Sequence, residues 1–172
     1  MRYYGRRRYL SGPDFGIGEI KRSKNVEACI EVPPLQYSLQ IVEEAVRAYG
    51  RVNVLVSNAG ICPFHTFLDM PDDLFIKTQQ VNFHGSFFIT RAIANQMAKQ
   101  EGEHRGGAIV AISSISAFFG GIQQTHYTPT KAAIKSLMES TSLALAPHGI
   151  RCNSILPGKS LKELILSPER VD

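Results

Sequence analysis

The spacing of apolar and polar residues predicts alternating helices and strands between residues 36 and 158. In "LQIVEEAVRAYG" (Leu39–Gly50) the apolar residues recur at helical spacing, and Gly50 stands where a residue that ends a helix is expected. The next run, "VNVLVSNAG", is rich in β-branched residues without polar alternation, which is typical of a strand buried on both faces. We therefore expect a helix followed by a central strand.

The alternation continues to the end of this region. Residues from about Pro71 to Lys99 have helical spacing, "GGAIVAISSIS" indicates a second buried strand, and Tyr127 to Ala146 a further helix. "IRCNSILPG" indicates a third strand, and Pro157 and Gly158 are expected to end it. Strands that alternate with helices form a parallel sheet covered by helices. The predicted fold class is α/β, with a doubly wound parallel sheet.

The first 35 residues do not share this pattern. They mix glycine, proline and charge, and their single strand-like run, Val26–Val32, is ended by two prolines. We therefore expect a poorly ordered N-terminal remnant over residues 1–35, a sheet domain over 36–158 and a short tail over 159–172.

Charge is concentrated in the same N-terminal region. The chain has 172 residues and a net charge of +4, and residues 1–24 hold seven basic and two acidic residues. The remainder has a net charge of −1, and no basic stripe continues into the sheet domain. We therefore expect no nucleic-acid partner.

Cysteine and hydropathy patterns bear on location. The three cysteines lack C-x-x-C spacing, so neither a disulfide framework nor a zinc site is indicated, and a reducing compartment, the cytoplasm, is expected. No run of eighteen apolar residues exists, so we expect no membrane span. The Arg-rich opening could be a mitochondrial presequence, but without a clear amphipathic period this is the less favoured alternative. No metal site is expected, because no histidine pair at i, i+4 encloses a carboxylate.

Ligands of parallel sheets bind at the carboxyl ends of the strands. The residues expected there are Asn58, Ala59 and Gly60 after the first strand, Ser113 and Ser114 after the second, and Pro157 and Gly158 after the third. The glycines would let the backbone approach a flat ligand. Taken alone, Asn-Ala-Gly is more typical of a plain turn.

Tyr127 and Lys131 are four residues apart and share a helix face. A phenol with a pKa of about 10 is a poor base at neutral pH, so it needs a nearby positive charge. Lys131 and the positive end of the helix would both lower this pKa. Ser114, at a strand end, could donate a hydrogen bond to the substrate oxygen with which Tyr127 would exchange a proton. The spacing alone is weak evidence, because helices often place a surface tyrosine and a solvated lysine in this way. With the strand, Ser114 and the turn around it, the catalytic interpretation is favoured.

Five motifs in one order resemble the short-chain dehydrogenase/reductase family over about Leu39 to Gly158. They are "SNAG", "VNFHG", "ISS", "YTPTK" and "IRCNSILPG". The resemblance implies a Rossmann-like enzyme that uses NAD or NADP and moves hydride between nicotinamide and a hydroxyl or carbonyl carbon. It implies that Tyr127 is the general acid/base, that Lys131 lowers its pKa and holds the nicotinamide ribose, that Ser114 positions the substrate oxygen and that Asn82 anchors a water in the proton relay.

The resemblance also implies a cofactor site and a partner. The implied cofactor-binding residues are Asn58, Ala59, Gly60, Tyr127, Lys131, Pro157 and Gly158, with Gly12, Gly16 and Gly18 at the spacing of the pyrophosphate-binding glycines. The helices that carry Asn82 and Tyr127 would form a homo-oligomer interface. "NAGICPFHTFLDMP" and "CNSILPG" are similar to sugar 1-dehydrogenases of the L-rhamnose type, which oxidise an aldose at C1.

The chain also departs from the family. Only 39 residues separate Gly18 from Asn58, too few for the expected elements, and the chain ends before the substrate-covering helices. We therefore expect a sheet that is incomplete at both ends, and a chain that holds the catalytic residues but turns over little or no substrate. Two alternatives stay open: an inactive fragment that acts by association with other chains, and a 3-oxoacyl-carrier-protein-type ketoreductase.

Overall fold

The structure, a computed structural model, describes residues 34–102 and 105–158. The chain divides into two units, Met1–Glu31 and Val32–Asp172, and every described residue belongs to the second. The predicted strand Val26–Val32, the three glycines Gly12, Gly16 and Gly18, and the predicted tail lie outside the described residues. The division of the chain into three parts stays a prediction.

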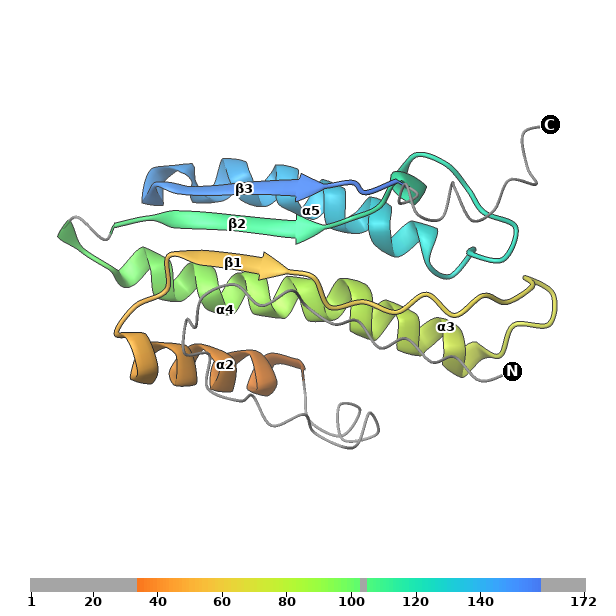
Figure 1. The fold of residues 1–172 in the computed structure, drawn as a ribbon, viewed down its shortest axis with the longest axis horizontal. Helices are drawn as coiled ribbons and strands as arrows, with labels where there is room; N and C mark the ends of the chain where they lie inside the picture. Colours follow the sequence, from red (N-terminus) through yellow and green to blue (C-terminus); the bar gives the residue numbers. More distant parts are fainter. Residues whose placement is uncertain (1–33, 103–104, 159–172) are drawn as a thin grey trace, which may run out of the picture. The chain divides into compact units, whose positions relative to one another are not determined.

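Strands and helices alternate along the described region as the hydrophobic pattern predicts (Figure 1). The elements are α2 (Pro34–Tyr49), β1 (Val54–Ser57), α3 (Asp72–Gln79), the π-helical turn η1 (Gln80–His84), α4 (Gly85–Lys99), β2 (Gly107–Ile112), the 3-10 turn η3 (Ile115–Ala117), α5 (Thr128–Leu145), the 3-10 turn η4 (Ala146–His148) and β3 (Ile150–Ile155). The strands lie in the order β1-β2-β3, and both neighbouring pairs are parallel. The predicted α/β class with a parallel sheet is confirmed.

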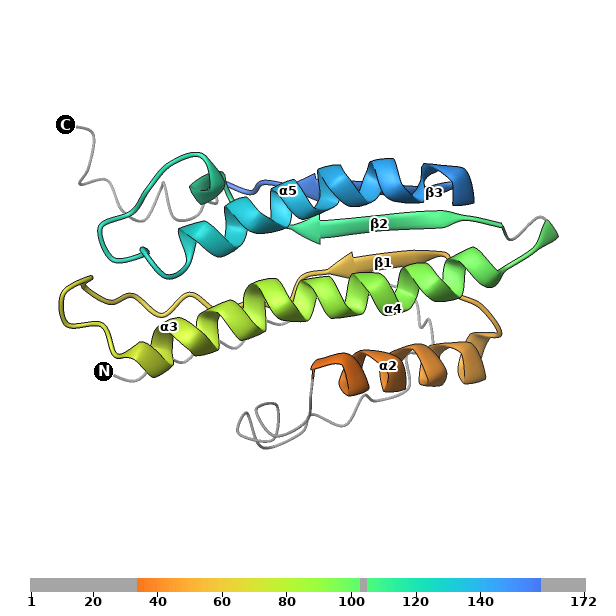
Figure 2. The same cartoon turned by 180° about the vertical axis from the view of Figure 1, so that it is seen from behind.

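One face of the sheet is covered by α4 and α5, and α2 packs beside α4 (Figures 1 and 2). The core lies between this face and the helices. Its largest fully buried apolar side chains are Ile109 and Ile150 from the strands and Met97, Ile134 and Met138 from the helices. Burial of these apolar side chains holds the helices on the sheet, because each fully buried side chain contributes about 1.5–3 kcal/mol relative to an exposed one.

The other face corrects the prediction for the first strand. Val54 and Val56 of β1 are each 59% exposed, while Leu55 between them packs against the core. None of the described helices lies over this face (Figure 1). The sequence is that of a strand covered on both faces, but too few residues lie between Gly18 and Asn58 for all the elements that would cover it, so exposed apolar residues were expected at this strand.

The helix boundaries also differ in part from the predicted ones. α2 begins at Pro34, before the predicted Leu39, and ends as predicted, with Gly50 at φ +75° and its N–H donating to Val46 O at 2.7 Å. The single helix predicted from Pro71 to Lys99 is interrupted by η1. No helix in the described part of the chain is long and apolar enough to cross a membrane.

Candidate active site

A cleft of about 320 Å³ opens at the carboxyl ends of the strands, where the parallel sheet was expected to bind a ligand. Seven of the residues predicted from the sequence line it: Asn58, Gly60, Ser114, Tyr127, Lys131, Pro157 and Gly158. Asn82 lies behind the lining and Ala59 is exposed beside it. The structure therefore brings together residues from three loops and one helix start that are up to about a hundred positions apart in the chain.

Ser114 lies two residues after the end of β2, and its side chain interacts with that of Tyr127. Its Oγ accepts a hydrogen bond from Ser116 N at 3.1 Å, which fixes the turn η3. A side-chain hydrogen bond also joins Ser114 to Tyr127. Ile115 N donates to Pro157 O at 2.9 Å, so the loops after β2 and β3 are held together. The Ser114 and Tyr127 hydroxyls thus meet at one place in the cleft.

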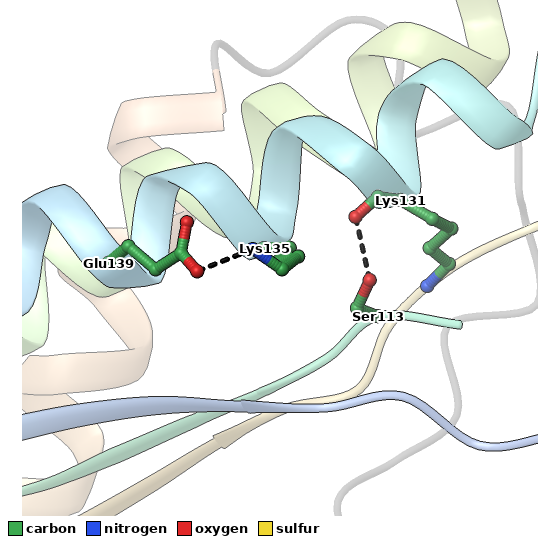
Figure 3. A network of polar contacts seen from close by, with 4 residues as sticks. All are labelled: Ser113, Lys131, Lys135 and Glu139. Atoms are coloured by element: carbon green, nitrogen blue, oxygen red, sulfur yellow. Dashed lines mark hydrogen bonds and ion pairs between the residues drawn. The ribbon is translucent and has the colours of Figure 1, made fainter. Parts of the chain in front are cut away.

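Lys131 is fixed to the end of β2 by both its backbone and its side chain. Its Nζ donates to Ile112 O at 2.8 Å, and Ser113 Oγ donates to Lys131 O at 2.6 Å (Figure 3). The ammonium group lies 5.5 Å from the centre of the Tyr127 ring, and the residue is only 5% exposed. A buried ammonium is therefore held in the cleft beside the phenol.

Burial controls the titration of this pair. Burial raises the pKa of Tyr127 above its usual value of 10.0, and the hydrogen bond with Ser114 opposes this rise. Burial likewise lowers the pKa of Lys131 below 10.5. The direction for Tyr127 differs from the sequence-based expectation of a lowered pKa. Desolvation of the phenolate outweighs the opposing effects, and Lys131 Nζ points at a backbone carbonyl.

Asn82 lies in η1 and is fully buried behind the cleft. Ile61 N donates to Asn82 Oδ1 at 2.8 Å, and Asn82 Nδ2 donates back to Ile61 O at 2.9 Å. The side chain therefore holds the loop that follows β1. The water-anchoring role implied by the family resemblance stays a prediction.

Gly60 is next to this amide and forms part of the cleft wall. A Cβ atom at position 60 would lie 3.3 Å from Asn82 Oδ1 and 3.5 Å from Lys131 Nζ. A larger residue would therefore fill the space in front of the ammonium group. The predicted importance of the glycine has a steric basis here.

Sequence reasoning missed two residues at the site. Cys62, half-buried, lines the cleft, and Gln124 Nε2 lies 3.7 Å from its sulfur. Thr130 is fully buried and hydrogen-bonded to both Asn82 and Tyr127. The position of Cys62 two residues after Gly60 was an available signal, whereas nothing in the sequence distinguishes Thr130 from other helix threonines.

Histidine and carboxylate side chains do not gather at the cleft. Among the described residues, no group of three or more His, Cys, Asp or Glu side chains is arranged to hold a metal ion. The chemistry offered by the described cleft is that of a hydroxyl pair beside a buried ammonium group.

The sequence of this chain matches a known protein family and several of its members. The sequence profile of the short chain dehydrogenase family matches residues 19–164. An L-rhamnose 1-dehydrogenase (NAD(P)(+)) from Sphingomonas sp. is 56% identical over 134 residues, which are 78% of this chain and 52% of the relative. One of the same name from Azotobacter vinelandii is 59% identical over 119 residues, 69% of this chain and 45% of the relative. The chain spans about half the length of the curated relatives it matches.

A solved structure shares the same arrangement of strands and helices. The crystal structure of a short-chain type dehydrogenase/reductase from Mycobacterium marinum superposes with a TM-score of 0.71 at 32% identity. The match covers 77% of this chain and 53% of that chain.

Proposed function

Because this chain belongs to the short-chain dehydrogenase family, we propose that its cleft serves NAD- or NADP-dependent hydride transfer, with C1 of an L-rhamnose-like aldose as the carbon oxidised. The observation that carries the reaction type is the meeting of the Ser114 and Tyr127 hydroxyls beside the Lys131 ammonium group. The sugar rests on the names of the two relatives.

The cleft suits the nicotinamide half of such a cofactor. Gly60 leaves room in front of Lys131 Nζ, and Pro157 and Gly158 form the facing wall. Lys131 Nζ would donate to the ribose hydroxyls, and Asn58 would border the ring. The bound cofactor supplies the hydride acceptor or donor. Gly12, Gly16 and Gly18, proposed to hold the pyrophosphate, lie outside the described residues.

Tyr127 would move the proton in this reaction. During oxidation the phenolate accepts the proton of the sugar hydroxyl, and Ser114 donates a hydrogen bond to the same oxygen to hold it in place. Lys131 stabilises the phenolate because it is a buried positive charge beside the ring. Since burial raises the pKa of Tyr127, the phenolate is scarce at neutral pH and oxidation should quicken as pH rises.

Replacement of the phenol by a phenyl ring tests the reaction type. We compare the chain and its Tyr127→Phe variant, each alone and each completed with the flanking residues of the Azotobacter vinelandii relative, with L-rhamnose and either cofactor. In the completed chain Tyr127→Phe should lower kcat on the order of 10²–10⁴-fold and leave the free energy of unfolding unchanged. Unchanged kcat would overturn the assignment of Tyr127.

A binding measurement separates an enzyme from an inactive fragment. NAD or NADP at 100 times its Kd should stabilise a chain that binds it by about 2.7 kcal/mol, measured as a rise in Tm. No rise with either cofactor would favour the inactive alternative. Reduction of a 3-oxoacyl thioester should be slower than sugar oxidation, and the reverse order would favour the ketoreductase alternative.

We further propose a homo-oligomer formed through α4 and α5. A groove of about 280 Å³ runs between these helices, with Phe87, Arg91 and Leu137 among its lining residues. The Arg91 guanidinium carbon lies 5.1 Å from the centre of the Phe87 ring, so the groove presents an aromatic ring and a positive charge side by side. Ser140→Arg in this groove should shift the molecular mass in solution toward the monomer, whereas Ala48→Arg on the exposed side of α2 should not. An unchanged mass for Ser140→Arg would exclude this interface.

The cellular location is proposed to be the cytoplasm. This proposal rests on the cysteine pattern, which favours a reducing compartment.

A further inference from the structure

Thr130 occupies an unusual place between the two halves of the site. It lies in the first turn of α5, one residue before Lys131, and is fully buried. Its Oγ1 donates to Tyr127 O at 2.6 Å and accepts from Asn82 Nδ2 at 3.1 Å. A hydroxyl has one proton to donate, so this donor is fully used, and its oxygen is also engaged as an acceptor.

The same Asn82 amide holds the loop after β1. Its Nδ2 also donates to Ile61 O at 2.9 Å, and its Oδ1 accepts from Ile61 N at 2.8 Å. An amide nitrogen has two protons, and both are used here, one toward Ile61 and one toward Thr130. An unbroken series of hydrogen bonds therefore runs from the loop containing Gly60 and Ile61, through Asn82 and Thr130, to the backbone of Tyr127.

Loss of the Thr130 hydroxyl would break this series of hydrogen bonds between Asn82 and the backbone of Tyr127. One Asn82 Nδ2 proton would then be buried without a partner, which costs about 1–3 kcal/mol. Tyr127 O also accepts from Thr130 N at 3.0 Å and from Lys131 N at 3.2 Å, but both bonds lie within the turn and do not reach η1. Among the described residues, the Thr130 hydroxyl makes the only hydrogen bond between this turn and η1.

We propose that Thr130 is a positioning residue: its hydroxyl fixes the backbone of Tyr127 relative to the loop that Asn82 holds beside the cofactor. The proposal rests on the function proposed above for Tyr127. Thr130 itself touches neither substrate nor cofactor. Its effect on the reaction is to keep the proton-transfer group and the cofactor-side loop in one relative geometry.

Three variants of the full 172-residue chain test this link. Thr130→Val removes the hydroxyl and keeps the shape, whereas Thr130→Ser keeps the hydroxyl and loses a methyl group. Thr78→Val is the matched control, because Thr78 is also fully buried and its hydroxyl donates to a helix carbonyl, Leu74 O at 2.8 Å, away from the cleft.

Amide hydrogen exchange is the first readout, because it needs no turnover. In Thr130→Val, exchange should rise about tenfold or more, together, at residues 58–62 and 127–131, relative to the core strand β2. Thr130→Ser should stay close to the parent at both segments, and Thr78→Val should change neither relative to β2. Unchanged exchange at 58–62 in Thr130→Val would overturn the proposal. So would raised exchange at both segments in Thr130→Ser, which keeps the test decisive if the valine variant does not fold.

Steady-state kinetics of the same variants in the completed chain, with L-rhamnose and cofactor, is the second readout. Thr130→Val should lower kcat about tenfold with little change in the KM for the sugar, and Thr130→Ser should restore kcat. A rise in KM at constant kcat would contradict a positioning role. If the completed parent shows no turnover, the proposed function fails, and the exchange pattern of the 172-residue chain still decides whether Thr130 couples the two segments.

Discussion

Gly106 and Gly149 approach so closely at the amino ends of the strands that a Cβ atom on Gly106 would lie 2.4 Å from Gly149 O. Both have positive φ, +87° and +69°, and Gly149 O accepts a hydrogen bond from Gly107 N at 3.3 Å. The backbones before β2 and β3 thus pack directly on each other and set the register in which Gly107 pairs with Ile150. This register places the far ends of both strands at the cleft.

Gly106→Ala should destabilise the chain strongly, because the new methyl group meets backbone that has little freedom to move. We expect a loss of roughly 3 kcal/mol or more in the free energy of unfolding, measured with urea. Gly50→Ala is the control, since Gly50 also has a positive φ, +75°, but no atom lies within 4 Å of a Cβ there. It should cost only the conformational strain, about 1–2 kcal/mol. Equal losses for both variants would show that the close approach does not matter.

Asn82→Asp should destabilise the site while barely changing the shape of the side chain. The carboxylate oxygen that replaces Nδ2 cannot donate to Ile61 O or to Thr130 Oγ1, and it would face the Ile61 carbonyl. The expected loss is about 3 kcal/mol in urea unfolding, since a buried charge loses water and gains no donor. Asn53→Asp, at an exposed position before β1, should change the stability by less than about 0.5 kcal/mol.

Lys131→Met and Ser114→Ala should separate two roles in the cleft. Lys131→Met removes the ammonium group beside the ring of Tyr127, so it should weaken cofactor affinity and also lower kcat. Ser114→Ala removes the hydroxyl bonded to Tyr127, so kcat should fall while the cofactor Kd stays close to the parent value. Cofactor titrations and steady-state kinetics on the same preparations of the completed chain give both quantities. The opposite pattern for Ser114→Ala would mean that the two roles are wrongly assigned.

The sequence was sufficient to predict the strands and the position of the cleft. β1 and β2 are β-branched or apolar runs that end at turns, and β3 ends shortly before Pro157 and Gly158. Parallel strands bring their carboxyl ends to one edge, so Asn58, Ser114 and Pro157 were expected to meet there. The helical spacing likewise placed Tyr127 and Lys131 on one face. These predictions depend on local periodicity and a general rule of sheet architecture.

The contacts across elements were not predictable in this way. The bonds between Asn82 and Ile61 join residues 21 positions apart, and periodicity does not indicate which buried amide faces which loop. The π-helical turn that carries Asn82 has no sequence signal that we recognised. The pKa of Tyr127 was misjudged because the charge of Lys131 was visible in the sequence and the depth of burial was not.

Cys62 offers a test of the charge in the cleft that does not depend on turnover. It is half-buried in the cleft wall, and burial raises the pKa of its thiol above 9.0. The charge of Lys131 and the hydrogen bond from Gln124 both oppose this rise. The thiolate is the form that attacks alkylating reagents, so at near-neutral pH Cys62 should react more slowly than an unburied cysteine.

Lys131→Met should slow the alkylation of Cys62 further. Loss of the positive charge removes a lowering effect on the thiol pKa, so the pKa rises and a smaller fraction is thiolate at near-neutral pH. Lys135→Met is the control, because Lys135 lies one turn further along α5 and pairs with Glu139 (Figure 3). It should leave the rate at Cys62 unchanged. The measurement is a time course of iodoacetamide labelling, read by peptide mass spectrometry, with the buried Cys152 as an internal reference. Faster labelling of Cys62 in Lys131→Met would show that access to the cleft, and not the charge of Lys131, limits the reaction.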